Sequence, residues 1–171
     1  AHKRYSVKHY QSYDCLYPGF KYNLTDIASS IGIHQLKRIK QNAVIRKNLW
    51  NIYNKYLSDI HGITLPLEED KNTYHARHLY AILLPLERLR ISRDRFVDLL
   101  IKSNIGSGVH FNPVHLHKYY RETYGYKKGD FPNAEYIGER MLSLPLGANL
   151  RKQDVMDVVR EVKSIFSSNY K

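Results

Sequence analysis

Cysteine is nearly absent from this sequence, since Cys15 is the only one among 171 residues. A single cysteine excludes a disulfide framework within one chain and disfavours a metal site built on thiolates. Cys15 lies among Tyr13, Asp14, Leu16 and Tyr17 with no adjacent base, so a nucleophilic role is also disfavoured. These absences favour a reducing compartment, and we expect a cytoplasmic protein.

Long apolar runs are lacking too. No stretch of about 18 apolar residues occurs, so the sequence predicts no transmembrane helix and no membrane partner. The first residues, AHKRYSVKHYQSYD, contain neither the apolar core of a secretory signal nor an initiator Met. We therefore expect the chain to begin inside a longer protein or after processing. The sequence also has no glycine-rich phosphate loop and no paired-carboxylate site.

Positive charge dominates what is present. The formal net charge is +11, and residues 1–60 hold ten Lys and Arg against three Asp and Glu. A basic chain favours an anionic partner, and charge alone does not choose among a nucleic acid, an anionic lipid and a phosphorylated small molecule. A nucleic acid is the least favoured, because the sequence shows neither helix-turn-helix spacing nor an evident aromatic stacking platform.

The strongest structural signal is a long helix over residues 24–60, where apolar residues recur at helical spacing. Asn23 is placed to cap this helix. The apolar stripe drifts around the helix axis, so we expect the helix to pack on something outside this chain or on a second copy of it. The later elements are predicted, in order, as a buried strand over 74–84, a helix capped by Ser92, an extended piece at 108–111, a loop to 132, a helix over 133–142, a strand over 142–144 and a helix over 151–167. This order indicates an α+β fold in which helices cover a small sheet.

The segment 106–132 has the most unusual composition, because it combines glycines, tyrosines and the histidines His110, His115 and His117 with Arg121. A metal site is one hypothesis, since His115 and His117 would face the same way on a strand. A catalytic base is a second. A contact for an anion or a sugar is a third, and a loop of solvated histidines remains the simplest alternative.

The start of the long helix poses a similar choice. Backbone N–H groups point outward at a helix N-terminus and suit an anion. Asn23 is therefore either a cap alone or an anion contact, and Lys21 nearby supports the second role. From the pattern alone the cap is the favoured hypothesis.

Three ordered blocks, PGFKYNLTDIASSIGIHQLKRI, ISRDRFVDLLIKSNIGSGVHFNPVHLHKYYRE and LSLPLGANLRKQDVMDVV, resemble the C-terminal half of DegT/StrS-type sugar aminotransferases. The resemblance covers nearly the whole chain. KYNLTDI, together with G-x-G-x-H-F and H-x-x-K-Y-Y-R-E, is most similar to the branch that aminates a UDP-linked keto-pentose to amino-arabinose. These are pyridoxal 5′-phosphate enzymes that take an amino group, usually from glutamate, and pass it to a nucleotide-linked keto-sugar.

The resemblance implies a C-terminal part of an aspartate-aminotransferase-like chain (PLP fold type I). Residues 1–60 would be the end of the large-domain region with a linking and dimerisation helix, and residues 61–171 a small α+β domain. It implies cofactor-phosphate binding by Asn23, with Lys21 as the alternative. It also implies substrate contacts by His110 and Phe111, with His115 as a further candidate, and a homodimer.

The resemblance also implies that the large domain, with the cofactor-bearing lysine, precedes Ala1. We therefore expect this chain alone neither to bind the cofactor nor to transfer amino groups, and we assign it no catalytic residue and no metal ligand. An alternative is a binding or dimerisation module without chemistry that acts beside an intact relative.

Overall fold

The structure is a computed structural model that describes Phe20 and residues 22–171. Contacts divide the chain into two units, residues 1–38 and residues 39–171, which are described separately. Lys21 and the predicted Pro18-Gly19 turn lie outside the described residues. No helix in the described ranges is both long and apolar enough to cross a membrane.

The long helix is confirmed as α1 (Asp26–Leu57). Its predicted cap is wrong, because the hydroxyl of Thr25, not Asn23, accepts the N–H of Ala28 at 3.3 Å. Thr25 therefore takes the capping position and satisfies one of the N–H groups that the first helical turn leaves without an internal partner.

The part of α1 that belongs to the first unit exposes its apolar side chains. Within residues 20–38 the exposed apolar side chains are Phe20, Tyr22, Leu24, Ile27, Ile31, Ile33 and Leu36, with exposed fractions between 54% and 84%. Exposed apolar faces of this kind mark association surfaces. The expectation that this surface packs on something outside this chain, or on a second copy of it, stays a prediction.

The second unit is built on two short antiparallel strands. β1 (Tyr80–Leu83) pairs with β2 (Met141–Leu144), and Tyr80 lies opposite Leu144. The strand predicted over 74–84 is therefore correct only from Tyr80 onward. Arg77 has a φ of +48°, which interrupts an extended backbone, and Tyr74 is 78% exposed. A strand extends only as far as it has a pairing partner, and β2 offers four residues.

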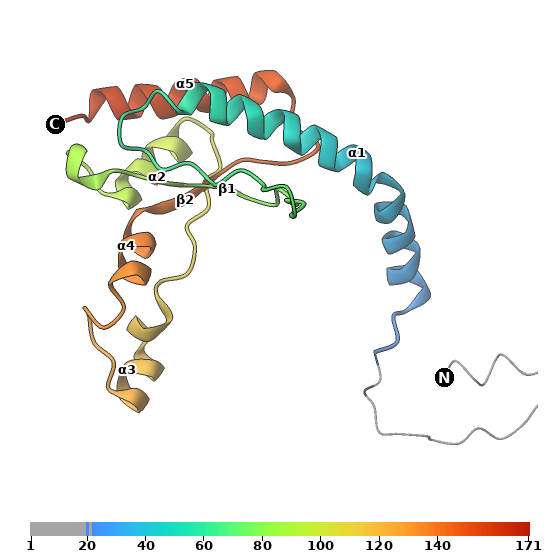
Figure 1. Ribbon diagram of the computed structural model, residues 1–171, viewed down its shortest axis with the longest axis horizontal. Coiled ribbons are helices and arrows are strands. Elements are labelled where there is room, and N and C mark those ends of the chain that lie inside the picture. Colours follow the sequence, from blue (N-terminus) through green and yellow to red (C-terminus); the bar gives the residue numbers. More distant parts are fainter. Residues whose placement is uncertain (1–19, 21) are drawn as a thin grey trace, which may run out of the picture. The chain divides into compact units, whose positions relative to one another are not determined.

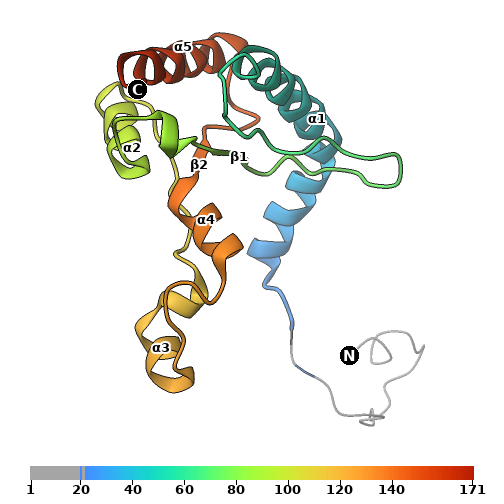
Figure 2. The same ribbon diagram turned by 60° about the vertical axis from the view of Figure 1, so that its left-hand side comes forward.

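The core of the second unit joins the end of α1, the sheet and two further helices. α2 (Arg93–Lys102) starts at Ser92, whose hydroxyl accepts the N–H of Arg95, as predicted. α5 (Lys152–Ser168) matches the predicted last helix. Figures 1 and 2 both show α5 beside the last turns of α1. The largest fully buried side chains are Trp50, Tyr53, Tyr80, Phe96, Leu57, Ile82, Leu84, Leu100, Leu142, Val155 and Val162.

The remaining elements lie on the other side of the sheet from α5 (Figures 1 and 2). They are the 3₁₀ turn η3 (Val114–Leu116), α3 (Lys118–Tyr124) and α4 (Pro132–Arg140), while another 3₁₀ turn, η2 (Leu86–Arg88), precedes α2. The prediction of a continuous loop up to residue 132 is therefore wrong. α3 ends at Gly125 in the left-handed conformation, and Pro132 occupies the first turn of α4, where its missing N–H costs nothing.

Candidate functional site

His110 lies beside the strand β2. Its Nε2 is 2.5 Å from the hydroxyl oxygen of Ser143. The backbones of Gly108 and Ser143 exchange two hydrogen bonds, with the Gly108 N–H donating at 3.0 Å and the Ser143 N–H at 2.8 Å. The segment around residue 108 is thus tied to the sheet, and it holds the His110 ring in a fixed place next to a buried serine.

Phe111, the next residue, is 91% exposed. A phenylalanine this exposed loses the free energy that burial of its ring would contribute, which is about 2 kcal/mol for a large apolar side chain. Its ring is therefore a candidate contact for a ligand or another chain.

His115 lies inside the second unit, with 6% of its side chain exposed. Its Nε2 is 2.9 Å from Oε1 of Glu135, which also accepts the N–H of Gly129 at 2.8 Å. Two hydrogen bonds lower the pKa of the Glu135 carboxyl: the one from the Gly129 N–H has the larger effect, and the one from His115 the smaller. Glu135 is therefore an ionised acceptor, and Nε2 of His115 is the ring nitrogen that donates to it.

This geometry bears on two of the earlier hypotheses for the histidines, the metal site and the solvated loop. His115 belongs to η3 and His117 is the residue directly before α3, so the two do not alternate along a strand as the metal hypothesis required. Among the described residues there is no group of three or more His, Cys, Asp or Glu side chains that could hold a metal ion. A loop of solvated histidines is also wrong for His115, because that ring is buried.

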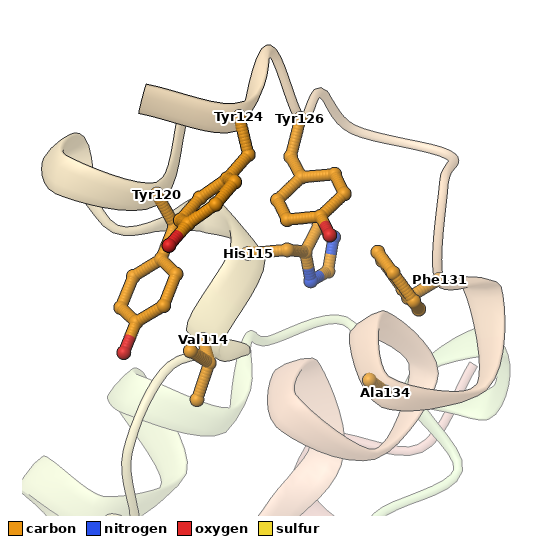
Figure 3. A pocket seen from close by; sticks show the side chains of 7 residues that line it. All are labelled: Val114, His115, Tyr120, Tyr124, Tyr126, Phe131 and Ala134. Carbon is orange, nitrogen blue, oxygen red and sulfur yellow. The ribbon is translucent and has the colours of Figure 1, made fainter. Parts of the chain in front are cut away.

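A hollow of about 450 Å³ opens next to His115. Figure 3 shows its seven lining side chains, which come from η3, α3, α4 and the turn between the helices. The His115 ring is 4.8 Å from Phe131, and Tyr126 is 5.4 Å from Phe131. The lining residues are Val114, His115, Tyr120, Tyr124, Tyr126, Phe131 and Ala134.

The other candidate residues belong to the first unit. Asn23 is exposed and lies just ahead of α1, while Lys21 lies outside the described residues. Asn23 is therefore in a different unit from His110, Phe111 and His115.

The sequence analysis did not predict a cluster of charged side chains that links the loop before β1 to α1. Oε1 of Glu69 is 3.1 Å from Arg77 and 3.3 Å from Lys47, and Glu69 accepts the N–H of His75 at 2.9 Å. The His75 N–H and then the Arg77 side chain lower the pKa of Glu69 from 4.5 to about 2. Arg77 is 3% exposed and lies over the ring of Trp50, so this cluster fastens the loop to α1.

Comparison with known sequences identifies relatives along nearly the whole chain. The chain is 47% identical over 169 residues to the Methanocaldococcus jannaschii protein MJ1066, covering 99% of this chain and 44% of that protein. It is 37% identical over 166 residues to the spore coat polysaccharide biosynthesis protein SpsC of Bacillus subtilis, covering 96% of this chain and 42% of SpsC. The chain thus spans less than half the length of these relatives.

Solved structures agree with the sequence relatives. The PLP form of the putative sugar aminotransferase Spr1654 from Streptococcus pneumoniae matches with a TM-score of 0.79 and 27% identity, over 92% of this chain and 39% of that one. Helicobacter pylori PseC, an aminotransferase involved in the biosynthesis of pseudoaminic acid, matches with a TM-score of 0.78 and 25% identity, over 95% of this chain and 43% of PseC. The α+β fold is thus that of part of a PLP-type aminotransferase.

A comparison of the sequence with models of protein families agrees with these relatives and structures. The model of the DegT/DnrJ/EryC1/StrS aminotransferase family matches residues 1–163. This match, and the order in which its elements are found in the fold, confirm the resemblance carried by the three sequence blocks. The chain belongs to the DegT/DnrJ/EryC1/StrS aminotransferase family.

Proposed function

We propose that this chain is the C-terminal part of an enzyme that moves an amino group from glutamate to a nucleotide-linked keto-sugar, for the synthesis of cell-surface polysaccharide or lipopolysaccharide sugars. The observation that carries this proposal is the family match over residues 1–163. The names of SpsC, Spr1654 and PseC support it, since each refers to a sugar, a polysaccharide or an aminotransferase. Glutamate and the nucleotide-linked substrate come from the resemblance of the motifs.

The cofactor would be pyridoxal 5′-phosphate, whose ring withdraws electrons from the carbon that gains or loses nitrogen. Asn23 fits its phosphate, because an exposed amide can donate two hydrogen bonds and the nearby start of α1 favours negative charge. In the proposed role Asn23 binds the phosphate, and Lys21 is the alternative residue for this contact. Thr25, which caps the helix, leaves Asn23 without that structural task.

The substrate contacts would come from the second unit. His110, positioned by Ser143, would donate or accept a hydrogen bond at the sugar, and the exposed ring of Phe111 would pack against the sugar's apolar face. His115, which lines the hollow described above, would be a further substrate contact. Each of these proposed roles is a binding contact. None of them requires a proton to move to or from this chain.

The assembly would be a homodimer in the cytoplasm. The exposed apolar side chains of α1 between Ile27 and Leu36 support a helix that packs against another chain or domain. The division into a linking region of residues 1–60 and a small domain of residues 61–171 belongs to this proposal. In the same proposal the cofactor lysine lies outside this chain, so the chain alone does not complete the reaction.

The cofactor contact is tested by binding. The gene product at its natural length is titrated with pyridoxal 5′-phosphate as wild type, as Asn23→Ala and as the matched control Asn48→Ala, which changes an exposed asparagine in the middle of α1. Loss of one or two hydrogen bonds to a phosphate predicts affinity about tenfold or more weaker for Asn23→Ala only. Equal affinities for all three proteins would remove Asn23 from the cofactor site.

A second outcome separates the non-catalytic alternative. If the natural protein binds no cofactor and co-purifies with a full-length aminotransferase, it is a binding module for that enzyme and does not itself contribute a cofactor site.

A further inference from the structure

We propose that Glu135 is a positioning residue for His115, because its buried carboxylate fixes the ring so that Nδ1 is left to accept a hydrogen bond from the substrate. This inference rests on the proposed function, which makes His115 a substrate contact. The positioning itself is measurable without any amino transfer.

Glu135 is a buried carboxylate in the first turn of α4. Only 7% of the residue is exposed, and it is not one of the seven residues that line the hollow. The positive end of the helix dipole favours a negative charge in this first turn. Glu135 therefore acts on a ligand only through the residues that it holds.

One oxygen of this carboxylate accepts hydrogen bonds from two different segments. Its Oε1 is 2.9 Å from Nε2 of His115 in η3, and it accepts the N–H of Gly129 at 2.8 Å. Tyr126 and Phe131, which lie on either side of Gly129 in the sequence, line the hollow together with His115. The carboxylate thus joins the histidine to the turn before α4.

The carboxylate also decides which nitrogen of the His115 ring carries a proton. The hydrogen bond from Gly129, and to a lesser extent the one from His115, hold the pKa of Glu135 below its ordinary value, so the carboxylate is ionised at neutral pH. An ionised carboxylate only accepts hydrogen bonds, so the ring nitrogen beside it, Nε2, must carry the proton. A neutral imidazole without such a neighbour can carry its proton on either nitrogen.

Packing restricts the same ring. The His115 ring lies 4.8 Å from the ring of Phe131, with an angle of 53° between the two planes. Figure 3 shows the His115 ring between the tyrosines and Phe131, beside the hollow. With Nε2 held by Glu135 and one side of the ring against Phe131, the polar atom left for a ligand is Nδ1.

Nδ1 of His115 is accessible from the hollow. It forms no hydrogen bond with residues 20 or 22–171, and it is not one of the fully buried, unpaired polar atoms of that part of the chain. The ring lines the hollow, so a ligand there can reach this atom. In the neutral ring Nδ1 is an acceptor, which suits a hydroxyl or N–H group of a substrate.

A purely structural role of Glu135 predicts a different pattern of effects. If Glu135 only fastened the turn through Gly129, its loss would disturb the hollow with or without His115. If Glu135 acts through His115, its loss should matter mainly while His115 is present. The effects of the two substitutions would then not be additive, as is usual for residues in direct contact.

The first test is nuclear magnetic resonance of this chain with isotopically labelled histidine, at about pH 8, where an ordinary histidine is neutral. Long-range proton–nitrogen spectra show which ring nitrogen carries the proton, and His115→Asn identifies the His115 signals by their loss. We expect the proton on Nε2 in the wild type and a mixture of both tautomers in Glu135→Leu. Glu135→Gln should keep the proton on Nε2 and move its resonance upfield, because a neutral oxygen is a weaker acceptor than a carboxylate.

Glu139→Leu is the matched control. Glu139 lies on the same helix with 52% of its side chain exposed, and it pairs with Lys128 and Arg140. Its replacement should leave the His115 signals unchanged. Circular dichroism shows which variants fold, and the upfield shift in Glu135→Gln carries the test if Glu135→Leu does not fold.

Kinetics of the gene product at its natural length, with a UDP-linked keto-sugar and glutamate, connect the positioning to the substrate. Glu135→Leu should raise KM for the keto-sugar about tenfold and change kcat by about threefold or less, because a lost binding contact acts on KM. Glu135→Gln, which keeps an acceptor, should stay close to the wild type. In a His115→Ala protein, Glu135→Leu should raise KM further by about twofold or less.

Three outcomes would overturn the inference. They are a proton on Nδ1 of His115 in the wild type, a tautomer and an Nε2 proton resonance that are the same in the wild type and in the folded Glu135 variants, and a rise in KM from Glu135→Leu that persists in full in the His115→Ala protein. Amino transfer with a His115 tautomer independent of Glu135 would contradict this inference alone. A Glu135-dependent tautomer in a protein that transfers no amino group would contradict the proposed function alone.

Discussion

The hydroxyl of Tyr53 donates a hydrogen bond to the carbonyl oxygen of Pro145 at 2.8 Å. It joins the end of α1 to the residue that follows β2, 92 positions later in the chain. The Tyr53 ring also stacks on Tyr80 of β1 at 4.5 Å, and Tyr53 has no exposed surface. This contact is one reason why the last turns of α1 belong to the same unit as the sheet.

Tyr53→Phe removes this hydrogen bond and keeps the ring. We expect a loss of about 1 kcal/mol in the free energy of unfolding, which is the usual net contribution of a hydrogen bond. Urea denaturation at neutral pH measures it. Tyr22→Phe is the control, because Tyr22 is 82% exposed and its replacement should change stability by less than about 0.5 kcal/mol.

Alkaline pH should destabilise the fold through the same pair of tyrosines. The pKa of Tyr53 is raised above its ordinary value of 10.0, mainly by burial and to a lesser extent by the neighbouring Tyr80. The pKa of Tyr80 is raised as well, mainly by burial and to a lesser extent by Glu68. Folded-state pKa values above the unfolded ones mean that the stability is fully present below pH 10 and is lost as the pH rises through the folded values.

The measurement is urea denaturation at about pH 8 and at about pH 11, on either side of the ordinary tyrosine pKa. The wild type should lose more stability between these two values than the Tyr53→Phe, Tyr80→Phe double variant. An equal loss in both proteins would show that these hydroxyls are not the groups responsible.

Acid should weaken the loop before β1. The folded pKa of Glu69 is about 2 against an ordinary value of 4.5, so its contribution to stability is present above pH 4.5 and is lost as the pH falls toward 2. Glu69→Gln should reduce the stability difference between pH 7 and acid. Glu122→Gln is the control, because the exposed Glu122 forms a loose pair with Lys118, with 3.9 Å between the charged atoms.

Two glycines give a sharp test of the packing beneath the candidate site. A Cβ at Gly138 of α4 would lie 2.8 Å from Cδ of Pro113, whereas one at Gly32 of α1 would meet no atom of residues 20 or 22–171 within 4 Å. Gly138→Ala should therefore destabilise the protein by about 1–3 kcal/mol, as overpacking does.

Gly32→Ala should be neutral or stabilising by up to about 1 kcal/mol, because alanine favours helix more than glycine does. Thermal unfolding of both variants measures the contrast. A Gly138→Ala variant as stable as the wild type would show that Pro113 and α4 are not in close contact.

The helices of this protein could be predicted wherever an apolar period is sustained. α1, α2 and α5 each repeat apolar residues over several turns, and in α2 and α5 that stripe is buried. α3 was missed because its sequence, KYYRETY, has no apolar stripe, and its end depends on the left-handed Gly125. The first strand was predicted too long, because its length depends on the four residues of β2.

The candidate site was only partly predictable, because the partners of its histidines are distant in the sequence. The residue types around His110 and His115 drew attention to the segment, and the family resemblance suggested the roles that we propose for them. Their partners came from elsewhere in the chain, since Ser143 is 33 positions from His110 and Glu135 is 20 positions from His115. No local pattern indicates such pairs, because tertiary packing alone brings β2 and α4 to this segment.

We propose that this sequence belongs to an enzyme that aminates a nucleotide-linked keto-sugar. The most direct test of this proposal uses the gene product at its natural length with pyridoxal 5′-phosphate, a UDP-linked keto-sugar and glutamate that carries an isotopic label on its amino nitrogen. Mass spectrometry follows the label. We expect labelled nitrogen in the sugar nucleotide and formation of 2-oxoglutarate. A cofactor-loaded, folded protein that leaves the label in glutamate with every nucleotide-linked keto-sugar offered would contradict it.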